Sequence, residues 1–199
     1  MLIIVGTGGH SKVVCASLEE NNFLDIQVRD DRVSKIKKNF MGKSIHSPAL
    51  LSNMHGSKLH VAIGDNLIRE QILMLGIKRG ALAASVIHPL SSIHNIDMVA
   101  NGSFIANGAI LSVDSSVGVG TIVNHNTVID HDCNIGTFCH IAPGSTIGGN
   151  VTIGKRVLVG SGATILPNII IGDDSIVGSG SVVTRSISKG TTWIGNKEV

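Results

Sequence analysis

The sequence is poor in aromatic and charged residues. Its 199 residues include no Tyr, one Trp and four Phe, charged residues make up only 15% of the chain, and the net charge is +2. A nucleic-acid-binding protein needs a basic face and aromatic side chains on which bases stack. This composition provides neither, so we expect no nucleic-acid partner. With 43% hydrophobic residues, the chain can still bury a proper core.

Long apolar runs and disulfide-forming cysteines are also missing. No stretch approaches the roughly 18 apolar residues that span a bilayer, and the start, MLIIVGTGGH, reads as a strand followed by a turn rather than a signal peptide. Three cysteines form an odd and sparse set, which argues against a disulfide framework. We therefore expect a cytoplasmic protein without a membrane partner.

The first part of the chain alternates strand-like and helix-like segments. The strands LIIVG, DIQVRD and KLHVAIG are separated by the helical runs HSKVVCASLEENN and NLIREQILMLGI. Strand, helix and strand in this order predict a small Rossmann-like βαβ domain with a parallel sheet, over residues 1–84.

From residue 85 onward an aliphatic residue returns at every sixth position. Small or β-branched residues usually follow four positions later, and pairs such as NG, PG, PN and DD fall between. One such unit cannot bury its own apolar residue, so the units must stack into a β-solenoid over residues 85–199. The aliphatic positions are Ile87, Ile93, Val99, Ile105, Leu111, Val117, Val123, Ile129, Ile135, Ile141, Ile147, Ile153, Val159, Ile165, Ile171, Val177 and Val183.

Four motifs together resemble one enzyme family. GTGGHSKVV opens the α/β domain, Asp30 and Asp31 follow its second strand, IGDN spans residues 63–66, and VIDHDCNIG lies in the repeat region. This combination resembles the bacterial sugar acyltransferases of the sialic acid O-acetyltransferase NeuD family, especially the nucleotide 4-amino-sugar N-acetyltransferases of the PglD type. The resemblance implies a left-handed parallel β-helix, a homotrimer with active sites between neighbouring β-helices, acetyl-CoA as co-substrate, and a nucleotide-linked amino sugar as acceptor.

The resemblance also assigns roles to individual residues. It makes His131 the catalytic general base and Asp132 the residue that tunes it, although the typical aminosugar enzymes have glutamate where Asp132 stands. It places Asn124 at the back of the same pocket. The residues that it implies for acetyl-CoA are His140, Gly149, Ser161 and Ser179. Those that it implies for the nucleotide sugar are Gly8, Gly9, His10, Asp30, Asp31 and Gly64.

The residues themselves agree with parts of this assignment. The turn from Gly6 to His10 follows a strand and opens a helix, so its N–H groups and helix dipole can receive a phosphate or another polar group. Ser11 replaces the third glycine of the dinucleotide fingerprint, which argues against a dinucleotide cofactor. Both this turn and the acidic pair Asp30-Asp31 also have a purely structural interpretation, as a tight turn and as a solvated strand end.

The stretch from Asn124 to His140 holds three histidines and two cysteines. His125 and His131 lie six residues apart, at equivalent places on successive sides of the coil, but only His131 has a carboxylate beside it. Cys133 and Cys139 hold the small-residue position and are expected to point inward, where they cannot share a metal with outward imidazoles. We therefore expect no metal.

Acetyl transfer to an amine fits these residues best. It needs a base near neutral pH, and a histidine beside a carboxylate provides one. Sialic acid O-acetylation, a metal-dependent hydratase of the carbonic anhydrase kind and a non-catalytic assembly subunit stay open as alternatives. The sequence does not identify the acceptor sugar, the nucleotide, the acyl length or the role of Trp193.

Overall fold

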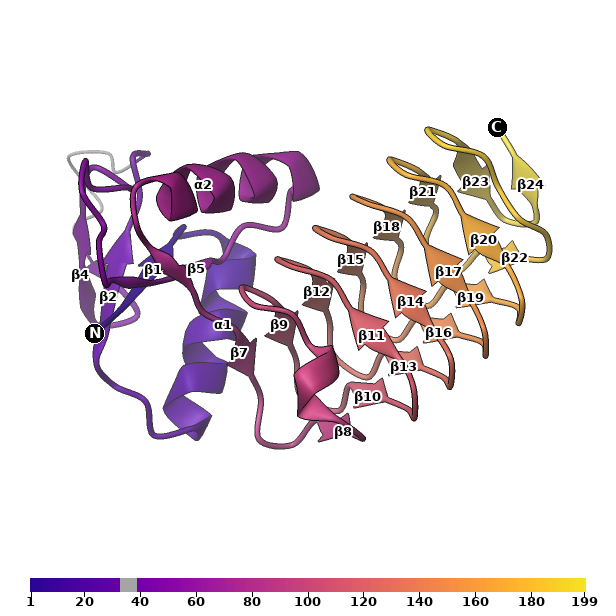
Figure 1. The fold of residues 1–199 in the computed structure, drawn as a ribbon, viewed down its shortest axis with the longest axis horizontal. Helices are drawn as coiled ribbons and strands as arrows, with labels where there is room; N and C mark the ends of the chain where they lie inside the picture. Colours follow the sequence, from indigo (N-terminus) through magenta and orange to yellow (C-terminus); the bar gives the residue numbers. More distant parts are fainter. Residues whose placement is uncertain (33–38) are drawn as a thin grey trace.

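The computed structural model describes residues 1–32 and 39–199 and divides them into an α/β region and a β-solenoid (Figure 1). This confirms the predicted fold class. The α/β region comprises β1 (Leu2–Val5), α1 (Gly9–Glu20), β2 (Ile26–Arg29), β3 (Asn39–Phe40), β4 (Lys43–His46), β5 (Lys58–Val61), α2 (Asn66–Lys78) and β6 (Leu82–Ala83).

The sheet of the α/β region has the order β3-β4-β2-β1-β5-β6. All pairs are parallel except β3 with β4, which is antiparallel. Strands are added on one side of β1 up to β4 and then on its other side from β5 onward, so the strand order switches between β1 and β5. In open α/β sheets, ligands bind in the crevice at such a switch point. The turn after β1 and the IGDN segment after β5 both lie at the carboxyl ends of these two strands, beside the switch point.

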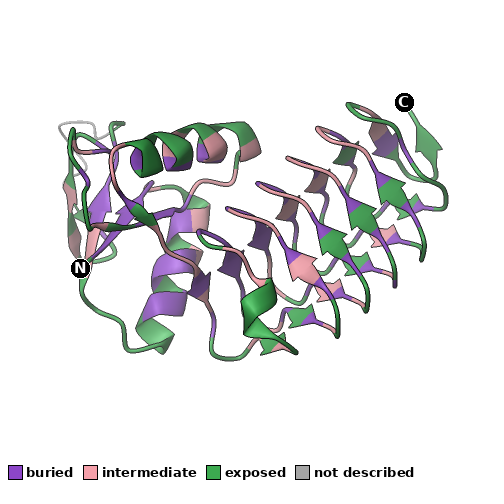
Figure 2. Cartoon of the chain, in the orientation of Figure 1, coloured by how far each residue is buried: buried purple, intermediate pink, exposed green. Residues whose placement is uncertain are grey.

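The two long helices were predicted almost to the residue, and each has a local reason for its start. The carboxylate of Asp65 caps α2 by accepting a hydrogen bond from the Ile68 N–H at 2.8 Å. Gly8 precedes α1 without any side-chain cap, which leaves N–H groups of its first turn available. One side of α1 is buried, whereas the outer side of α2 is exposed (Figure 2).

The β-solenoid has three sheets with a period of three hexapeptides, and their strands are parallel except for the antiparallel pair of β23 and β24. Ile110 pairs with Val128, and Val128 pairs with Thr146, in each case eighteen residues further along the chain. Its short strands, grouped by sheet, are β7 (Val86–Ile87), β9 (Phe104–Ile105), β12 (Ile122–Val123), β15 (His140–Ile141), β18 (Leu158–Val159), β21 (Ile176–Val177), β23 (Thr192–Ile194) and β24 (Lys197–Glu198); β8 (Ser92–Ile93), β10 (Ile110–Leu111), β13 (Val128–Ile129), β16 (Thr146–Ile147), β19 (Thr164–Ile165) and β22 (Val182–Val183); and β11 (Ser116–Val117), β14 (Asn134–Ile135), β17 (Thr152–Ile153) and β20 (Ile170–Ile171). A single 3-10 turn, η1 (Ile96–Met98), interrupts the first coil.

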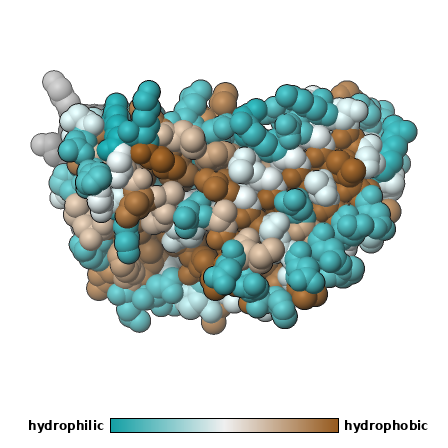
Figure 3. Space-filling view, viewed as in Figure 1, coloured by the Kyte–Doolittle hydropathy of each residue, from teal (hydrophilic) through white to brown (hydrophobic). Residues whose placement is uncertain are grey.

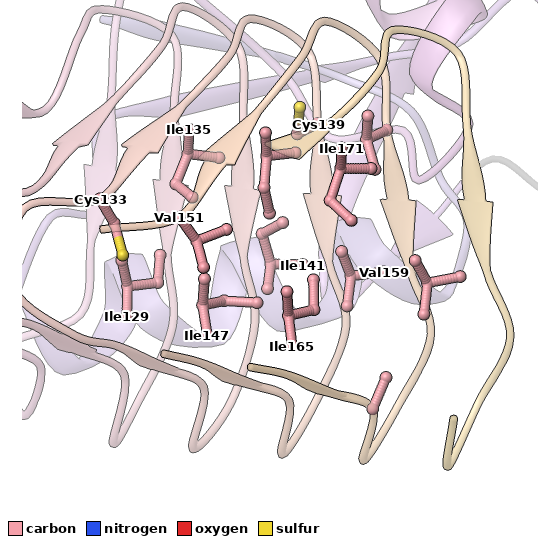
Figure 4. Close-up of a cluster of buried hydrophobic side chains, with 14 of the residues drawn as sticks. Ile129, Cys133, Ile135, Cys139, Ile141, Ile147, Val151, Val159, Ile165 and Ile171 are labelled. Carbon is pink, nitrogen blue, oxygen red and sulfur yellow. The ribbon is translucent and has the colours of Figure 1, made fainter. Parts of the chain in front are cut away.

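The predicted aliphatic column fills the solenoid (Figure 4). From Ile105 to Val183 every aliphatic residue of the register is buried, whereas Ile87, Ile93 and Val99 are only partly buried at the open first coil. Cys133 and Cys139 point into this column, as predicted. Trp193 is 1% exposed and closes the far end, which answers the question that the sequence left open about this residue.

The corners of the solenoid explain the second sequence pattern. Every sixth residue from Gly102 to Gly180 has a positive φ. Gly, Asn and Asp tolerate this left-handed conformation, and they occupy all but two of these positions. The two others are Phe138 and Arg156, and both lie at the corner that faces α2, where Phe138 packs with Leu73 and Arg156 contacts Glu70.

Candidate active site

His131 lies on an exposed solenoid corner between two carboxylates. Its Nδ1 is 2.7 Å from Asp132 Oδ2, and its backbone N–H donates to Asp130 Oδ1 at 2.8 Å. Because a carboxylate only accepts hydrogen bonds, Nδ1 carries the proton. The unprotonated Nε2 is then left free to take a proton from a substrate.

The backbone of Asp132 brings its short side chain to the ring. Asp132 has φ 60°, the left-handed conformation of the corner position, and both side chains of the pair are about half exposed, at 54% and 56%. The hydrogen bond with Asp132 and the charge of Asp130 raise the pKa of His131. This arrangement is what a general base with a tuning carboxylate requires.

Gly149 supports the His131 ring from the next coil. A Cβ built at residue 149 would lie 2.6 Å from both Cε1 and Nε2 of His131. Any side chain at this position would therefore push the imidazole away. The resemblance assigns Gly149 to acetyl-CoA, and the structure places it against the ring of His131.

A second cluster lies where the solenoid faces the α/β region. His140 Nδ1 is 3.3 Å from the carbonyl oxygen of Gly64, and His140 Nε2 is 3.2 Å from Nδ2 of Asn124. Asn124 Oδ1 accepts hydrogen bonds from both the backbone N–H and Nδ1 of His125, each at 2.9 Å. Burial, together with the nearby guanidinium of Arg69, lowers the pKa of His140 to about 4, so its ring is neutral at physiological pH.

In the glycine turn after β1, Gly8 and Gly9 face a cavity, whereas the side chain of His10 is packed against the solenoid. A Cβ at Gly8 or Gly9 would meet nothing within 4 Å, and both glycines line a cavity of about 400 Å³ together with Thr7 and Lys12. The side chain of His10 turns instead toward the solenoid, where it packs edge-on against Phe104 at 5.1 Å between ring centroids. Burial lowers the pKa of His10 well below its usual value, and its Nε2 has no partner within the described part of the protein.

Asp30 and Asp31 lie at the carboxyl end of β2, beside a cavity of about 230 Å³. Asp30 is buried and accepts hydrogen bonds from the Thr7 hydroxyl at 2.7 Å and from the Arg32 N–H at 2.8 Å. Burial acts to raise its pKa, but these hydrogen bonds outweigh it, so the pKa is lowered overall. Asp31 Oδ1 accepts from the Ala49 N–H at 2.6 Å. Apolar side chains, including Ile63, Ile68 and Ile72, line the rest of the cavity.

The structure brings the predicted residues together in three groups within one chain. The first is the sheet edge of the α/β region, which continues through Gly64 to His140 and Asn124. The second is the corner of His131, Asp132 and Gly149. The third is formed by Ser161 and Ser179, which are exposed on the corner that follows the β15-β18-β21 sheet. Asn124 therefore lies with His140 in this chain rather than behind His131.

Sequence reasoning missed Asp130 and Arg69. Asp130 precedes His131 as Asn124 precedes His125 six residues earlier, and each accepts a hydrogen bond from the backbone N–H of its histidine, so the repeat register itself could have identified Asp130. Arg69 is 1% exposed although it sits in an amphipathic helix, where an arginine normally indicates the solvent side. Nothing in the sequence signals its burial.

Two classes of feature were not found among residues 1–32 and 39–199. No group of three or more His, Cys, Asp or Glu side chains lies close enough to hold a metal ion. No helix in this part of the chain is long and apolar enough to cross a membrane.

Comparisons with known proteins agree with this geometry. The family model of the PglD N-terminal domain matches residues 1–74, and that of the bacterial transferase hexapeptide matches residues 150–185. The whole chain aligns with GDP-perosamine N-acetyl transferase from Caulobacter crescentus, solved as a mutant with CoA and GDP-perosamine, at 30% identity, with 95% of that chain covered and a TM-score of 0.87. The chain belongs to the PglD/NeuD-like family of sugar acyltransferases.

Two further members of the PglD/NeuD-like family align over the whole chain. The acetyltransferase domain of PglB from Neisseria gonorrhoeae, solved with acetyl coenzyme A, is 30% identical, with 97% of it covered and a TM-score of 0.91. WeeI from Acinetobacter baumannii AYE is 26% identical, with 98% covered and a TM-score of 0.80. No match was found among the curated proteins.

Proposed function

We propose that the protein is an acetyltransferase that moves the acetyl group of acetyl-CoA to the amino group of a nucleotide-linked amino sugar. The observation that carries the proposal is the His131–Asp132 pair on a solenoid of this family, with Nδ1 held by the carboxylate and Nε2 free. The full-length similarity to a structure that contains both CoA and GDP-perosamine supports this class of substrates.

In the proposed reaction, the uncharged sugar amine attacks the thioester carbonyl carbon, and a C–N bond forms. His131 Nε2 takes the proton from the amine nitrogen, and the resulting imidazolium is stabilised by Asp132. The tetrahedral intermediate then collapses, the C–S bond breaks, and CoA leaves as a thiolate that recovers the proton. Backbone N–H groups of the solenoid and the neighbouring side chains supply donors for the developing oxyanion.

The proposed substrate sites use the groups described above. The turn of Gly8 and Gly9, with Asp30, Asp31 and Gly64, holds the nucleotide sugar at the edge of the sheet. His140, Gly149, Ser161 and Ser179 hold acetyl-CoA along the solenoid. The apolar-walled cavity beside Asp31 suits a nucleobase, because it combines aliphatic walls with carboxylate acceptors at one edge.

These sites require more than one chain, so we propose a homotrimer. His131 lies at the corner between the β13 and β14 strands, whereas His140 lies on β15 and faces Gly64 of the α/β region. A sugar held at Gly64 is therefore on a different side of the solenoid from His131 of its own chain. A neighbouring solenoid can bring its own His131 to that sugar. Exposed apolar side chains on the solenoid strands, among them Ile110, Ile170 and Val182, offer contact surface for such neighbours. Figure 3 shows hydrophobic surface on the solenoid in this view.

We place the reaction in the cytoplasm, where acetyl-CoA is available. The three cysteines are free and buried, which fits a compartment in which thiols stay reduced.

A panel of nucleotide-linked amino sugars incubated with acetyl-CoA tests the proposal, with free thiol release as the signal. We expect release with at least one amino sugar and none with the matching sugars that carry a hydroxyl in place of the amine. Thiol release with only the hydroxyl sugars or only sialic acid would instead support the interpretation as an O-acetyltransferase. Release with no sugar would contradict the proposal.

A further inference from the structure

Arg69 is a buried arginine that no carboxylate neutralises among its described contacts. Its side chain is 1% exposed, and its hydrogen bonds go to neutral oxygens from three segments. Nε donates to the Gly120 carbonyl at 2.7 Å, and Nη1 donates to the carbonyls of Ile63 and Gly64 at 2.9 and 3.0 Å. Nη2 donates to Asn66 Oδ1 at 2.7 Å and to the carbonyls of Phe138 and Cys139, both at 2.9 Å.

Burying this arginine costs free energy that is hard to explain if Arg69 only joins the α/β region to the solenoid. Burying a charge carries a large desolvation cost, and an apolar side chain of similar volume commonly stabilises a buried contact as well or better. The apolar packing of Leu73 on Phe138 and the ion pairs of Glu70 with Lys155 and Arg156 already join the two parts. What distinguishes Arg69 is that one of its acceptors, the Gly64 carbonyl, also contacts His140.

One of these carbonyls, that of Gly64, starts a chain of hydrogen bonds whose direction is determined at both ends. The Gly64 oxygen can only accept, so Nδ1 of the neutral His140 ring carries the proton, and Nε2 must accept. At the other end, the backbone N–H of His125 can only donate, so the atom it meets is Oδ1 of Asn124, and Nδ2 faces His140. Both ends require the same tautomer of His140.

We propose that Arg69 is a positioning residue: by fixing the Gly64 carbonyl, it holds the His140 ring and, together with Asn124, its Nδ1–H tautomer, and it couples the sugar side of the site to the acetyl-CoA side. The assignment of the two sides rests on the proposed function. The positioning of His140 itself does not, because it follows from the hydrogen bonds alone.

The other titratable groups around His140 do not offer the same restraint. His10 of α1 lies 6.3 Å away between ring centroids, with burial keeping its ring neutral, and His125 reaches His140 only through Asn124. Arg69 is therefore the charged group that acts on this ring, and its charge also favours the neutral imidazole.

The test is the tautomer of His140, read from the ¹⁵N shifts of its imidazole in protein labelled on histidine. Wild type is expected to show Nδ1–H. In Arg69→Met, the Gly64 carbonyl is no longer held by the guanidinium, so only the Asn124 side still favours Nδ1–H. We therefore expect a mixture of the Nδ1–H form and the Nε2–H form that free imidazole side chains favour. Arg69→Lys is the second variant in case Arg69→Met fails to fold, because one ammonium cannot reach the carbonyls of Gly64, Phe138 and Cys139 together.

Two controls separate positioning from a general effect. Glu70→Ala removes ion pairs between α2 and the solenoid without touching Gly64. Arg79→Met removes the arginine that directly follows α2 and donates to the carbonyls of Leu50 and Leu51. Both should keep the wild-type tautomer. An unchanged His140 in the folded Arg69 variants, or an equal change in Glu70→Ala, would overturn the proposal.

Kinetics add a second readout in the active enzyme. Arg69→Lys is expected to raise the KM for both acetyl-CoA and the nucleotide sugar by about tenfold, as for the loss of a hydrogen bond to a charged group. The tautomer measurement needs no substrate, so it decides the proposal even if no sugar is acetylated.

Discussion

The imidazole of His131 rests directly on Gly149 of the following coil, with room for a hydrogen atom but not for a methyl group. A Cβ at residue 149 would lie 2.6 Å from Cε1 and Nε2 of the ring. Residue 149 lies eighteen residues after His131, at the same corner one coil further on. The relationship predicts that residue 149 acts on the chemical step through His131.

Gly149→Ala should lower kcat by about 10-fold or more, because the methyl group displaces the base from its position. The backbone of Gly149 has no positive φ, so alanine fits the backbone and the melting temperature should change little. Steady-state kinetics with acetyl-CoA varied will check this. If Gly149→Ala raised only the KM for acetyl-CoA, residue 149 would serve the co-substrate alone, as the resemblance implies.

Asp132→Asn should move the acidic limb of the pH dependence of kcat to lower pH. The carboxylate stabilises the imidazolium and raises the pKa of His131, so its loss lowers that pKa, and the base stays unprotonated further into acid. The weaker base should also reduce the plateau rate, by about tenfold. Asp130→Asn is the matched control, since its charge has the smaller influence on the pKa; a shift as large as that of Asp132→Asn would show that the hydrogen bond at Nδ1 is not the main cause.

Asp30→Ala should raise the KM for the nucleotide sugar with little change in the KM for acetyl-CoA. Asp30 holds Thr7 beside the glycine turn through a 2.7 Å hydrogen bond, so its removal loosens the proposed nucleotide site and leaves the chemical step intact. Asp25→Ala is a suitable control, because Asp25 is an exposed aspartate that pairs with the amino terminus. Equal damage to both KM values would argue against separate sites.

Phe138→Ala should lower the free energy of unfolding by about 3 kcal/mol, because a phenyl ring is lost from a buried contact. Phe138 is 4% exposed and packs in the cluster that contains Leu73 of α2. Asn126→Ala, at an exposed corner position with the same positive φ, should cost clearly less. Urea denaturation of both variants measures the difference, and similar values would mean that Phe138 contributes little to the contact with α2.

The periodic parts of the molecule could be predicted from sequence, and the contacts between its parts could not. Repetition at six residues determines which side chains point inward, so Cys133 and Cys139 were placed correctly without any structure. The strands β3, β4 and β6 were missed, because segments such as KSIH at Lys43–His46 are short and lack an apolar pattern. The boundary predicted after residue 84 lies between β6 and β7, yet Val86 and Phe104 share an apolar cluster with α1 residues such as Val14.

In the candidate site, too, contacts between chain neighbours could be predicted from sequence, and contacts between distant segments could not. His131 and Asp132 are neighbours in the chain, so their pairing was accessible from sequence. The bonds of Arg69 with Gly120 and Cys139, and of His140 with Gly64, join residues more than fifty positions apart. These groups meet only in the folded chain, and no local sequence pattern predicts their contacts.

The central claim is that His131 is the general base, and its substitution by alanine tests this most directly. With acetyl-CoA and an accepted amino sugar, His131→Ala should lower kcat by about 10²–10⁴, the usual contribution of a positioned base, while the KM for acetyl-CoA stays near the wild-type value. His94→Ala, which removes another exposed solenoid histidine, should retain wild-type kcat. A His131→Ala enzyme whose kcat matches that of wild type would contradict the account.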